Sequence, residues 1–218
     1  MSEICESMKE LISKEELDKA FDSRFPKEMQ ERLRGAKVAV AGLGGLGSNI
    51  SVTLARSGVG KLLLVDFDIV DVTNLNRQMY FIEHLGKPKT EALTELLYRI
   101  NPYIEYESVC VKVTPDNVRE LFKDYPIVCE AFDRPDQKAM LVREVLAKCP
   151  NAIVVSGNGM AGYADTNEIK TTKMMRRLYV CGDQKTDVGN GIGLIAPRVA
   201  ACAAHQANKV LQLIMQND

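Results

Sequence analysis

Residues 38–66 read VAVAGLGGLGSNISVTLARSGVGKLLLVD, and three elements of regular structure follow one another within them. The apolar run Lys37–Ala41 predicts a short buried strand that ends at a cluster of glycines. Leu46–Ser57 has helical character and stops at Gly58, and the apolar run Lys61–Asp66 predicts a second buried strand. A strand, a helix and a strand within so short a span predict a parallel pair with a right-handed crossover.

The glycines after the first strand have the spacing of a phosphate-binding loop. Gly42, Gly44 and Gly47 form the pattern G-x-G-x-x-G, with Gly45 inside the same loop. The first glycine permits a tight turn, the second lets backbone N–H groups approach a phosphate, and the third lets the helix pack on the strand. Asp66 ends the next strand about 20 residues later, where its carboxylate can accept hydrogen bonds from a ribose. These features predict a nucleotide site rather than a glycine turn without a ligand.

The composition is that of one ordinary globular domain, with 218 residues, 46% of them hydrophobic and 26% charged. Because 28 basic residues nearly balance 29 acidic ones, no positive field exists to attract a nucleic acid. No apolar segment approaches the roughly 20 residues that cross a bilayer. The N-terminus lacks the basic start and the apolar run of a signal peptide. We therefore expect a cytoplasmic protein whose partners are neither nucleic acid nor membrane.

Six cysteines are scattered along the chain, and no two of them form the close pair that a zinc site requires. We expect free thiols and no zinc.

Helices and strands continue to alternate after Asp66, with short connections between them. This alternation predicts an α/β, doubly wound fold with a mostly parallel sheet and a Rossmann-like nucleotide-binding half. The further expected strands and helices are the strands Tyr106–Val111, Ile127–Glu130 and Ala152–Ser156, and helices at Lys89–Ile100, from Pro115 or Asp116, and at Gln137–Ala147.

Both ends of the chain are expected to be helical. An amphipathic helix over Met8–Phe21 and a short helix between Pro26 and Gly35 predict an N-terminal helical extension, residues 1–34, on a single domain, residues 35–218. Ala196–Met215 is alanine-rich and predicts a closely packed helix. Glycines and polar residues dominate Gly157–Gly193, which we therefore expect to be a mobile, loop-like segment.

A second group of polar residues follows the acidic strand end. Asn74, Arg77 and Gln78 lie in the sequence TNLNRQ, and Lys89 follows at an expected helix start. The pyrophosphate of a dinucleotide is usually bound by backbone and helix dipole, whereas a triphosphate that loses pyrophosphate needs fixed positive charge and a metal ion. Arg77 and Lys89 therefore favour a triphosphate, although either could be an ordinary surface charge.

Asp133 follows the expected strand Ile127–Glu130 and could bind Mg²⁺, which one or two carboxylates commonly hold together with phosphates. Asp68 and Glu130 could assist it. The alternative is that Asp133 is the N-cap of the next helix.

Taken together, these motifs resemble the ubiquitin-activating-type adenylyltransferases of the ThiF/MoeB superfamily, and most closely the short ThiF-like proteins of thiamine biosynthesis that activate the sulfur carrier ThiS. The resemblance covers about Leu33 to the C-terminus. It implies that the glycines bind the phosphates of ATP, that Asp66 binds the ribose, and that Asp133 holds Mg²⁺. The remaining ATP contacts that it implies are Asp68, Asn74, Arg77, Gln78 and Lys89.

The reaction that this resemblance implies is attack by the C-terminal glycine carboxylate of a ubiquitin-like carrier ending in Gly-Gly on the α-phosphorus of ATP. The products are an acyl-adenylate and pyrophosphate. A carboxylate is already ionised at neutral pH, so the enzyme needs no strong base. Catalysis then requires positioning of the reactants and neutralisation of charge on the pyrophosphate, which Arg77, Lys89 and Mg²⁺ could supply.

The chain departs from the family in several places. Many relatives hold zinc with two C-x-x-C pairs, which are absent from this sequence. Many also carry a cysteine in a loop over the active site, and Cys181 lies in that general region, where Arg176 and Arg177 could lower the pKa of its thiol. Family dimers insert an N-terminal arginine into the neighbouring site, and Arg24 is the counterpart in an expected homodimer. The segment Gly157–Gly193 is the candidate cover for the carrier's tail.

Three alternatives remain open at this stage. An NAD-dependent oxidoreductase uses the same strand-helix-strand unit, but hydride transfer gives no reason for Arg77, Lys89 and Asp133. A nucleotide-sensing module would bind ATP without releasing pyrophosphate. Within the adenylating class, a molybdopterin-type carrier, or a small-molecule or RNA-linked carboxylate or carbonyl oxygen, could replace ThiS.

Overall fold

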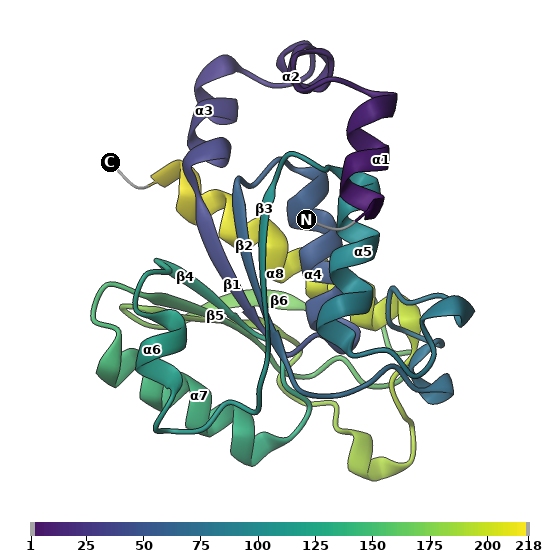
Figure 1. Ribbon diagram of the computed structural model, residues 1–218. Helices are drawn as coiled ribbons and strands as arrows, with labels where there is room; N and C mark the ends of the chain where they lie inside the picture. The colour runs from purple at the N-terminus through teal and green to yellow at the C-terminus, as the bar shows by residue number, and fades with distance from the viewer. Residues whose placement is uncertain (1–2, 217–218) are drawn as a thin grey trace.

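The structure is a computed structural model that describes residues 3–216, and these residues form one sheet of seven strands with helices on both faces (Figure 1). The strand order is β3-β2-β1-β4-β5-β7-β6, and all neighbours are parallel except β6 and β7. The strands are β1 Lys37–Ala41, β2 Lys61–Asp66, β3 Glu105–Cys110, β4 Ile127–Glu130, β5 Ile153–Gly157, β6 Lys170–Met175 and β7 Leu178–Gly182. The predicted doubly wound α/β fold is confirmed.

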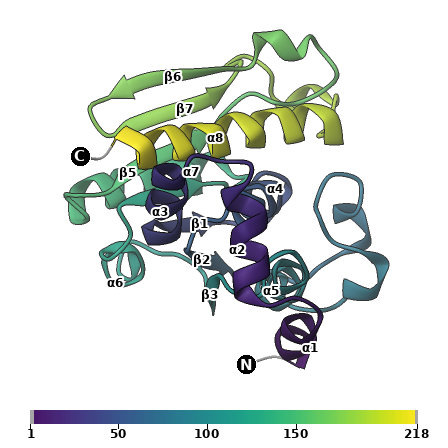
Figure 2. The ribbon, with the colours of Figure 1, turned by 90° about the horizontal axis from the view of Figure 1, so that it is seen from above.

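Residues 3–216 include eight α-helices, five of which form two layers on the sheet. They are α1 Glu3–Leu11, α2 Lys14–Asp22, α3 Lys27–Gly35, α4 Gly45–Arg56, α5 Lys89–Ile100, α6 Val118–Phe122, α7 Pro135–Lys148 and α8 Ala196–Gln216. Helices α4, α5 and α8 cover one face of the sheet, and α6 and α7 cover the other. Viewed from above, α8 runs beside the outer strands β6 and β7 (Figure 2).

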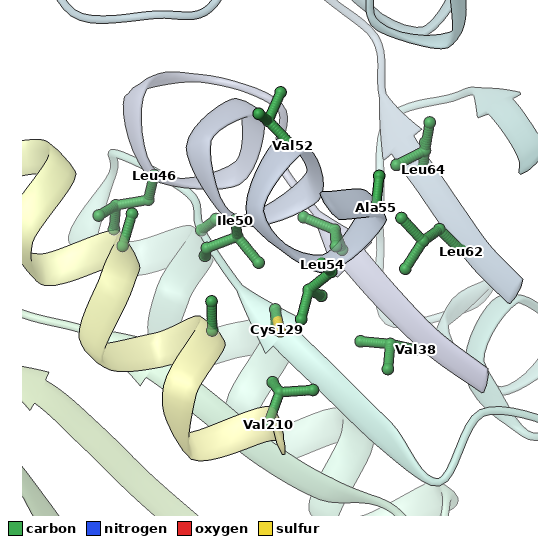
Figure 3. Close-up of a cluster of buried hydrophobic side chains, with 14 of the residues drawn as sticks. Val38, Leu46, Ile50, Val52, Leu54, Ala55, Leu62, Leu64, Cys129 and Val210 are labelled. Atoms are coloured by element: carbon green, nitrogen blue, oxygen red, sulfur yellow. The ribbon is translucent and has the colours of Figure 1, made fainter. Parts of the chain in front are cut away.

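Two hydrophobic cores lie on the two faces because successive side chains of a strand point to opposite sides. In β1, Val38 and Val40 belong to one core, whereas Ala39 and Ala41 belong to the other. Figure 3 shows how apolar side chains of α4 and α8 meet those of β1, β2 and β4 in the first core. Since both faces of the sheet are covered at its centre, β1, β2, β4 and β5 read as mostly apolar runs.

The N-terminal helices differ from the sequence prediction. The expected single helix Met8–Phe21 is two helices, α1 and α2, because Ser13 forms a capping box with Glu16 and starts a new helix. Helix α1 packs on α5, and α3 packs on α8, where Arg32 Nη1 donates to the Met215 carbonyl oxygen at 2.9 Å. The division into residues 1–34 and 35–218 stays a prediction.

The expectation that Gly157–Gly193 is loop-like is wrong for its central part. Strands β6 and β7 form an antiparallel hairpin there, and β7 pairs in parallel with β5. Every residue of β6 is exposed, so this strand lacks the alternation of apolar and polar residues by which a strand is recognised in a sequence. The glycines lie before and after the hairpin and at the end of β7.

Helix α6 begins at Val118 rather than near Pro115, because Thr114 N–H donates to Asn117 Oδ1 at 2.8 Å and closes a turn before the helix. Within residues 3–216, no helix is both long enough and apolar enough to cross a membrane.

Candidate functional site

A cavity of about 680 Å³ lies at the carboxyl ends of the parallel strands, on the side of the fold where doubly wound proteins bind ligands. Nearly all residues singled out from the sequence line it. They are Gly42, Gly44, Gly45, Asp66, Asp68, Asn74, Arg77, Gln78, Lys89 and Asp133. Gly47 does not line the cavity, and its place in the loop is structural.

The glycine loop has little space for side chains. Gly42 has φ +89°, and a Cβ there would lie 2.8 Å from the Ala131 carbonyl oxygen. A Cβ on Gly47 would lie only 1.8 Å from the Gly42 carbonyl oxygen. The loop therefore turns tightly between β1 and α4, and Ala131 and Phe132, the residues after β4, lie against Gly42.

Helix α4 presents its N-terminus to the cavity. Its N-cap, Gly44, makes no side-chain hydrogen bond, and its first turn carries no acidic residue. The N–H groups and the positive end of the helix dipole are consequently directed at a ligand without a competing carboxylate. This arrangement suits a phosphate.

The carboxylate of Asp66 joins the glycine loop to the end of β2. Leu43 N–H donates to Oδ2 at 2.6 Å, and Phe67 and Asp68 N–H groups donate to Oδ1 at 2.7 and 2.9 Å. An ionised carboxylate has about four acceptor positions, so one remains for a ribose hydroxyl. Asp66 is buried but borders the cavity.

Lys89 is the most buried cation that the sequence analysis selected, with its side chain 8% exposed. Its Nζ lies 2.9 Å from Asp68 Oδ2, and its backbone N–H donates to the Asp68 carbonyl oxygen at 2.9 Å. Lys89 is therefore not an ordinary surface charge. It is a preorganised cation paired with one carboxylate at the cavity wall.

The 74–80 segment is fastened to α4 and to the glycine loop. Asn49 Nδ2 donates to the Arg77 carbonyl oxygen at 3.2 Å, and Met79 N–H donates to Ser48 Oγ at 3.2 Å. Tyr80 Oη donates to the Leu43 carbonyl oxygen at 2.8 Å, and burial, with Asp66 and Asp68 nearby, raises the pKa of Tyr80. The segment is thus held at the loop through three separate contacts.

Arg77 and Gln78 each keep a buried polar atom without a partner among the residues that the structure describes. Arg77 Nε and Gln78 Oε1 make no hydrogen bond, although Arg77 Nη1 donates to the Thr73 carbonyl oxygen at 3.1 Å. Such unpaired buried groups are unfavourable unless a ligand or water completes them. Asn74 contributes its side-chain oxygen to the preceding turn, where it accepts from Asp71 N–H at 3.1 Å. These atoms point to a polar ligand.

Asp133 is exposed and lines the cavity. The alternative that it caps α7 does not hold, since the N-cap of α7 is Arg134. Glu130 does not line the cavity. It is fully buried, and it accepts hydrogen bonds from Ser156 Oγ at 2.5 Å and from Lys138, whose Nζ lies 2.8 Å from Oε2.

Several lining residues carry no signal in the sequence. Lys138 lines the cavity and also donates to the Phe132 carbonyl oxygen at 3.0 Å. This hydrogen bond fixes the residues between β4 and α7, where Phe132 lies against Gly42 of the glycine loop. Lys112 Nζ lies 5.9 Å from the centre of the Phe67 ring, and both residues line the cavity. Thr186 comes from the glycine-rich region. No motif spacing links these positions, because the fold alone brings them together.

Cys181 lies in β7 and does not line the cavity. Burial raises the pKa of its thiol, and the contact with Thr171 Oγ1 at 3.4 Å only partly opposes this effect. Arg177, which could have lowered that pKa, instead donates to the Leu146, Cys149 and Ala152 carbonyl oxygens. The structure therefore does not bring Cys181 into the site.

Arg24 is exposed and lies between α2 and α3, and Figure 1 shows these two helices beyond the ends at which β1 and β2 begin. The cavity lies at the carboxyl ends of the strands, so Arg24 does not line it within one chain.

Comparison with known proteins shows the family of the chain. Its residues 18–218 match the ThiF family. The tRNA threonylcarbamoyladenosine dehydratase of Haemophilus influenzae is 35% identical over 149 residues, 67% of this chain and 56% of that protein. The sulfur carrier protein adenylyltransferase of Thermus thermophilus is 37% identical over 126 residues, 56% of this chain and 46% of that protein. The chain spans about half the length of these curated relatives.

Among solved structures, the Escherichia coli tRNA N6-threonylcarbamoyladenosine dehydratase in complex with ATP has a TM-score of 0.81. The identity is 24%, and the match covers 90% of this chain and 93% of that one, which shows a common fold. The family match extends over residues 18–218, far more than half of the sequence. The chain therefore belongs to the ThiF family.

Proposed function

We propose that this protein is an adenylyltransferase that uses ATP to activate the C-terminal glycine of a ubiquitin-like sulfur carrier of the ThiS type. The observation that carries the proposal is the cavity itself. One wall holds a glycine loop with an open helix N-terminus, and beside it lie the buried cation Lys89 and the unpartnered Arg77 Nε. A dinucleotide gives no reason for these two cations, whereas a triphosphate does.

Different residues interact with the ribose, the phosphates and the leaving pyrophosphate. Asp66 keeps one acceptor position for the ribose, and the N-terminus of α4 faces the phosphates. Arg77 and Lys89 neutralise charge that accumulates on the leaving pyrophosphate. The carrier carboxylate is ionised at neutral pH, so the protein only has to place it in line with the α-phosphorus.

Mg²⁺ fits the residues present. Among the residues described, no group of three or more His, Cys, Asp or Glu side chains could hold a metal ion by itself. A magnesium ion shared with phosphates needs only one or two carboxylates, and Asp133 offers one at the cavity. When bound, the ion would neutralise phosphate charge and help to orient the leaving group. Asp68 already pairs with Lys89, which favours Asp133 as the ligand.

Support for a carrier protein as the substrate comes from the relative named sulfur carrier protein adenylyltransferase, together with the motif resemblance to the short ThiF-like proteins. The expected homodimer, with Arg24 reaching the neighbouring site, is part of the same proposal. So is the glycine-rich region around the hairpin as a cover for the carrier's tail, because Gly159, Met160 and Thr186 line the cavity.

The test is to incubate the protein with ATP, Mg²⁺ and single purified carriers that end in Gly-Gly, and to measure the intact mass of each carrier. The panel holds a ThiS-type carrier, a molybdopterin-type carrier and, as a matched control, the ThiS-type carrier without its last glycine. We expect an AMP adduct on the ThiS-type carrier alone. No adduct on any carrier would contradict the proposal, and an adduct on the molybdopterin-type carrier would change the substrate.

A second candidate is action on a tRNA, because three relatives are named tRNA threonylcarbamoyladenosine dehydratase and match about two thirds of this chain. The balanced charge of the chain favours a carrier over a nucleic acid. ATP consumption that depends on added tRNA, with none for the carriers, would favour this second candidate.

A further inference from the structure

The first turn of α8 contacts both the glycine loop and the chain on either side of the β6–β7 hairpin, through two adjacent residues. Val199 lies against the glycine loop, since a Cβ on Gly45 would be 2.9 Å from Val199 Cγ1. Arg198 points elsewhere and forms a buried ion pair with Asp183 at the end of the β6–β7 hairpin. Arg198 Nη1 also donates to the Asp165 carbonyl oxygen at 2.9 Å, before the hairpin.

Asp183 in turn fixes the residues that follow it. Its Oδ1 accepts hydrogen bonds from the backbone N–H groups of Lys185 and Thr186 at 2.8 and 2.9 Å, and its Oδ2 accepts from Thr186 Oγ1 at 2.9 Å. Although burial by itself raises the pKa of Asp183, these hydrogen bonds and Arg198 hold it below its ordinary value. Asp183 is therefore an ionised anchor.

Residues 183–188, which we call the 183–188 wall, form one side of the cavity through Thr186, Asp187 and Val188. Thr186 Oγ1 also accepts a hydrogen bond from Ala161 N–H at 3.1 Å, and Ala161 is another cavity residue. The anchor thus joins the wall to the chain segment that enters the hairpin.

The wall crosses that segment with almost no free space. A Cβ on Gly182 would lie 1.8 Å from the Asn158 carbonyl oxygen, and a Cβ on Gly159 would lie 2.2 Å from Asp183 Oδ1. Asp183 N–H donates to the Gly159 carbonyl oxygen at 2.9 Å. A small shift of Asp183 is consequently passed on to the cavity lining.

The arrangement has no obvious advantage for stability alone. A buried ion pair is often no more stabilising than well-packed apolar side chains, whereas it fixes a geometry closely. Here the residues that the pair holds are exposed apart from Thr186, which is only partly buried, so apolar packing could not fix them.

We propose that Arg198 and Asp183 are positioning residues that hold the 183–188 wall at a set distance from the glycine loop, with the first turn of α8 as the spacer. The inference rests on the proposed function in so far as the cavity binds ATP. Neither Arg198 nor Asp183 lines the cavity, so any effect of their replacement on ATP has to act through the wall.

The test measures the wall first without nucleotide and then with it. Lys185 is exposed, and trypsin cleavage after it reports how often the wall opens. The variants are Asp183→Asn, Arg198→Lys and Thr186→Val. Thr186→Ser keeps the hydroxyl, and Arg177→Lys is a matched control that weakens an arginine bound to carbonyl oxygens outside the cavity.

We expect Asp183→Asn, Arg198→Lys and Thr186→Val to speed cleavage after Lys185 and to raise the Kd for a fluorescent ATP analogue about tenfold, the factor for about 1.4 kcal/mol. Thr186→Ser should have a cleavage rate and a Kd within about twofold of the wild-type values, and Arg177→Lys should change neither quantity. Thr186→Val keeps the test valid if the buried pair proves necessary for folding.

Folded Asp183→Asn and Thr186→Val variants with wild-type cleavage and wild-type Kd would overturn the inference. If the wild-type protein binds no ATP, the proposed function fails, and the cleavage rates measured without nucleotide still decide whether the anchor holds the wall.

Discussion

Replacing Gly47 with alanine is expected to weaken nucleotide binding strongly while the sheet and its helices still form. The added Cβ would lie 1.8 Å from the Gly42 carbonyl oxygen and 2.8 Å from its carbonyl carbon. Both contacts are with backbone, so no side-chain rotation relieves them. The glycine loop and the start of α4 must move apart by roughly 1 Å or more to relieve these contacts. Close packing of the protein interior leaves no empty space that would accept the added methyl group.

The size of the effect follows from that displacement. Inserting a methyl group into a packed site costs about 1–3 kcal/mol of stability. The N–H groups of the loop move with the backbone, and each hydrogen bond to a charged group is worth about 1.5–3 kcal/mol. Loss of one such bond raises the Kd for ATP about 10-fold to 100-fold.

Titration with a fluorescent ATP analogue measures this Kd, and thermal unfolding measures stability. Two other glycine-to-alanine variants give a graded control. A Cβ on Gly35 meets nothing within 4 Å, so Gly35→Ala should bind like wild type. A Cβ on Gly45 meets side-chain atoms of Val199 and Arg77, which can shift, so Gly45→Ala should be intermediate. A Gly47→Ala protein with the wild-type Kd would refute this reasoning.

Three further outcomes are expected. Asp133→Asn should reduce carrier-dependent ATP–pyrophosphate exchange at least about 10-fold without changing thermal stability. The control Asp136→Asn, at an exposed carboxylate outside the cavity, should retain the exchange, and equal rates in the two variants would remove Asp133 from the site. Tyr80→Phe should lower stability by about 1 kcal/mol and weaken ATP binding, because the hydroxyl that donates to the Leu43 carbonyl oxygen is lost, and a thermal shift with ATP titration measures both. A thiol reagent at neutral pH should label only Cys110 quickly, since the other five cysteines are buried, and burial raises the pKa of Cys129, Cys149, Cys181 and Cys202. Rapid labelling of Cys181 in the folded protein would contradict its buried position in β7.

The central part of the fold could be predicted because its strands are buried on both faces. Runs such as Lys61–Asp66 carry enough apolar residues to be recognised without alternation, and the helix Lys89–Ile100 agrees with the structure at both ends. The hairpin of β6 and β7 could not be recognised in the same way. All six residues of β6 are exposed, so only pairing with β7 identifies it as a strand.

In the candidate site, too, residues in continuous motifs could be predicted from the sequence, whereas isolated residues could not. Residues in contiguous motifs, such as the glycine loop and the segment around Arg77, were selected from the sequence and line the cavity. Lys138 and Thr186 were missed, because their contribution depends on contacts between distant segments. The family resemblance alone makes Cys181 a candidate, and the structure puts its side chain inside the fold, where a thiolate is unfavourable.

The most direct test of the central claim is the exchange of labelled pyrophosphate into ATP, measured with and without the ThiS-type carrier. Exchange requires that the protein form an acyl-adenylate and reverse the reaction, so it reports the proposed chemistry itself. We predict exchange that depends on the intact carrier terminus and that falls sharply in Lys89→Met, which removes the buried cation. Exchange that is absent, or that proceeds equally without a carrier, would contradict the account.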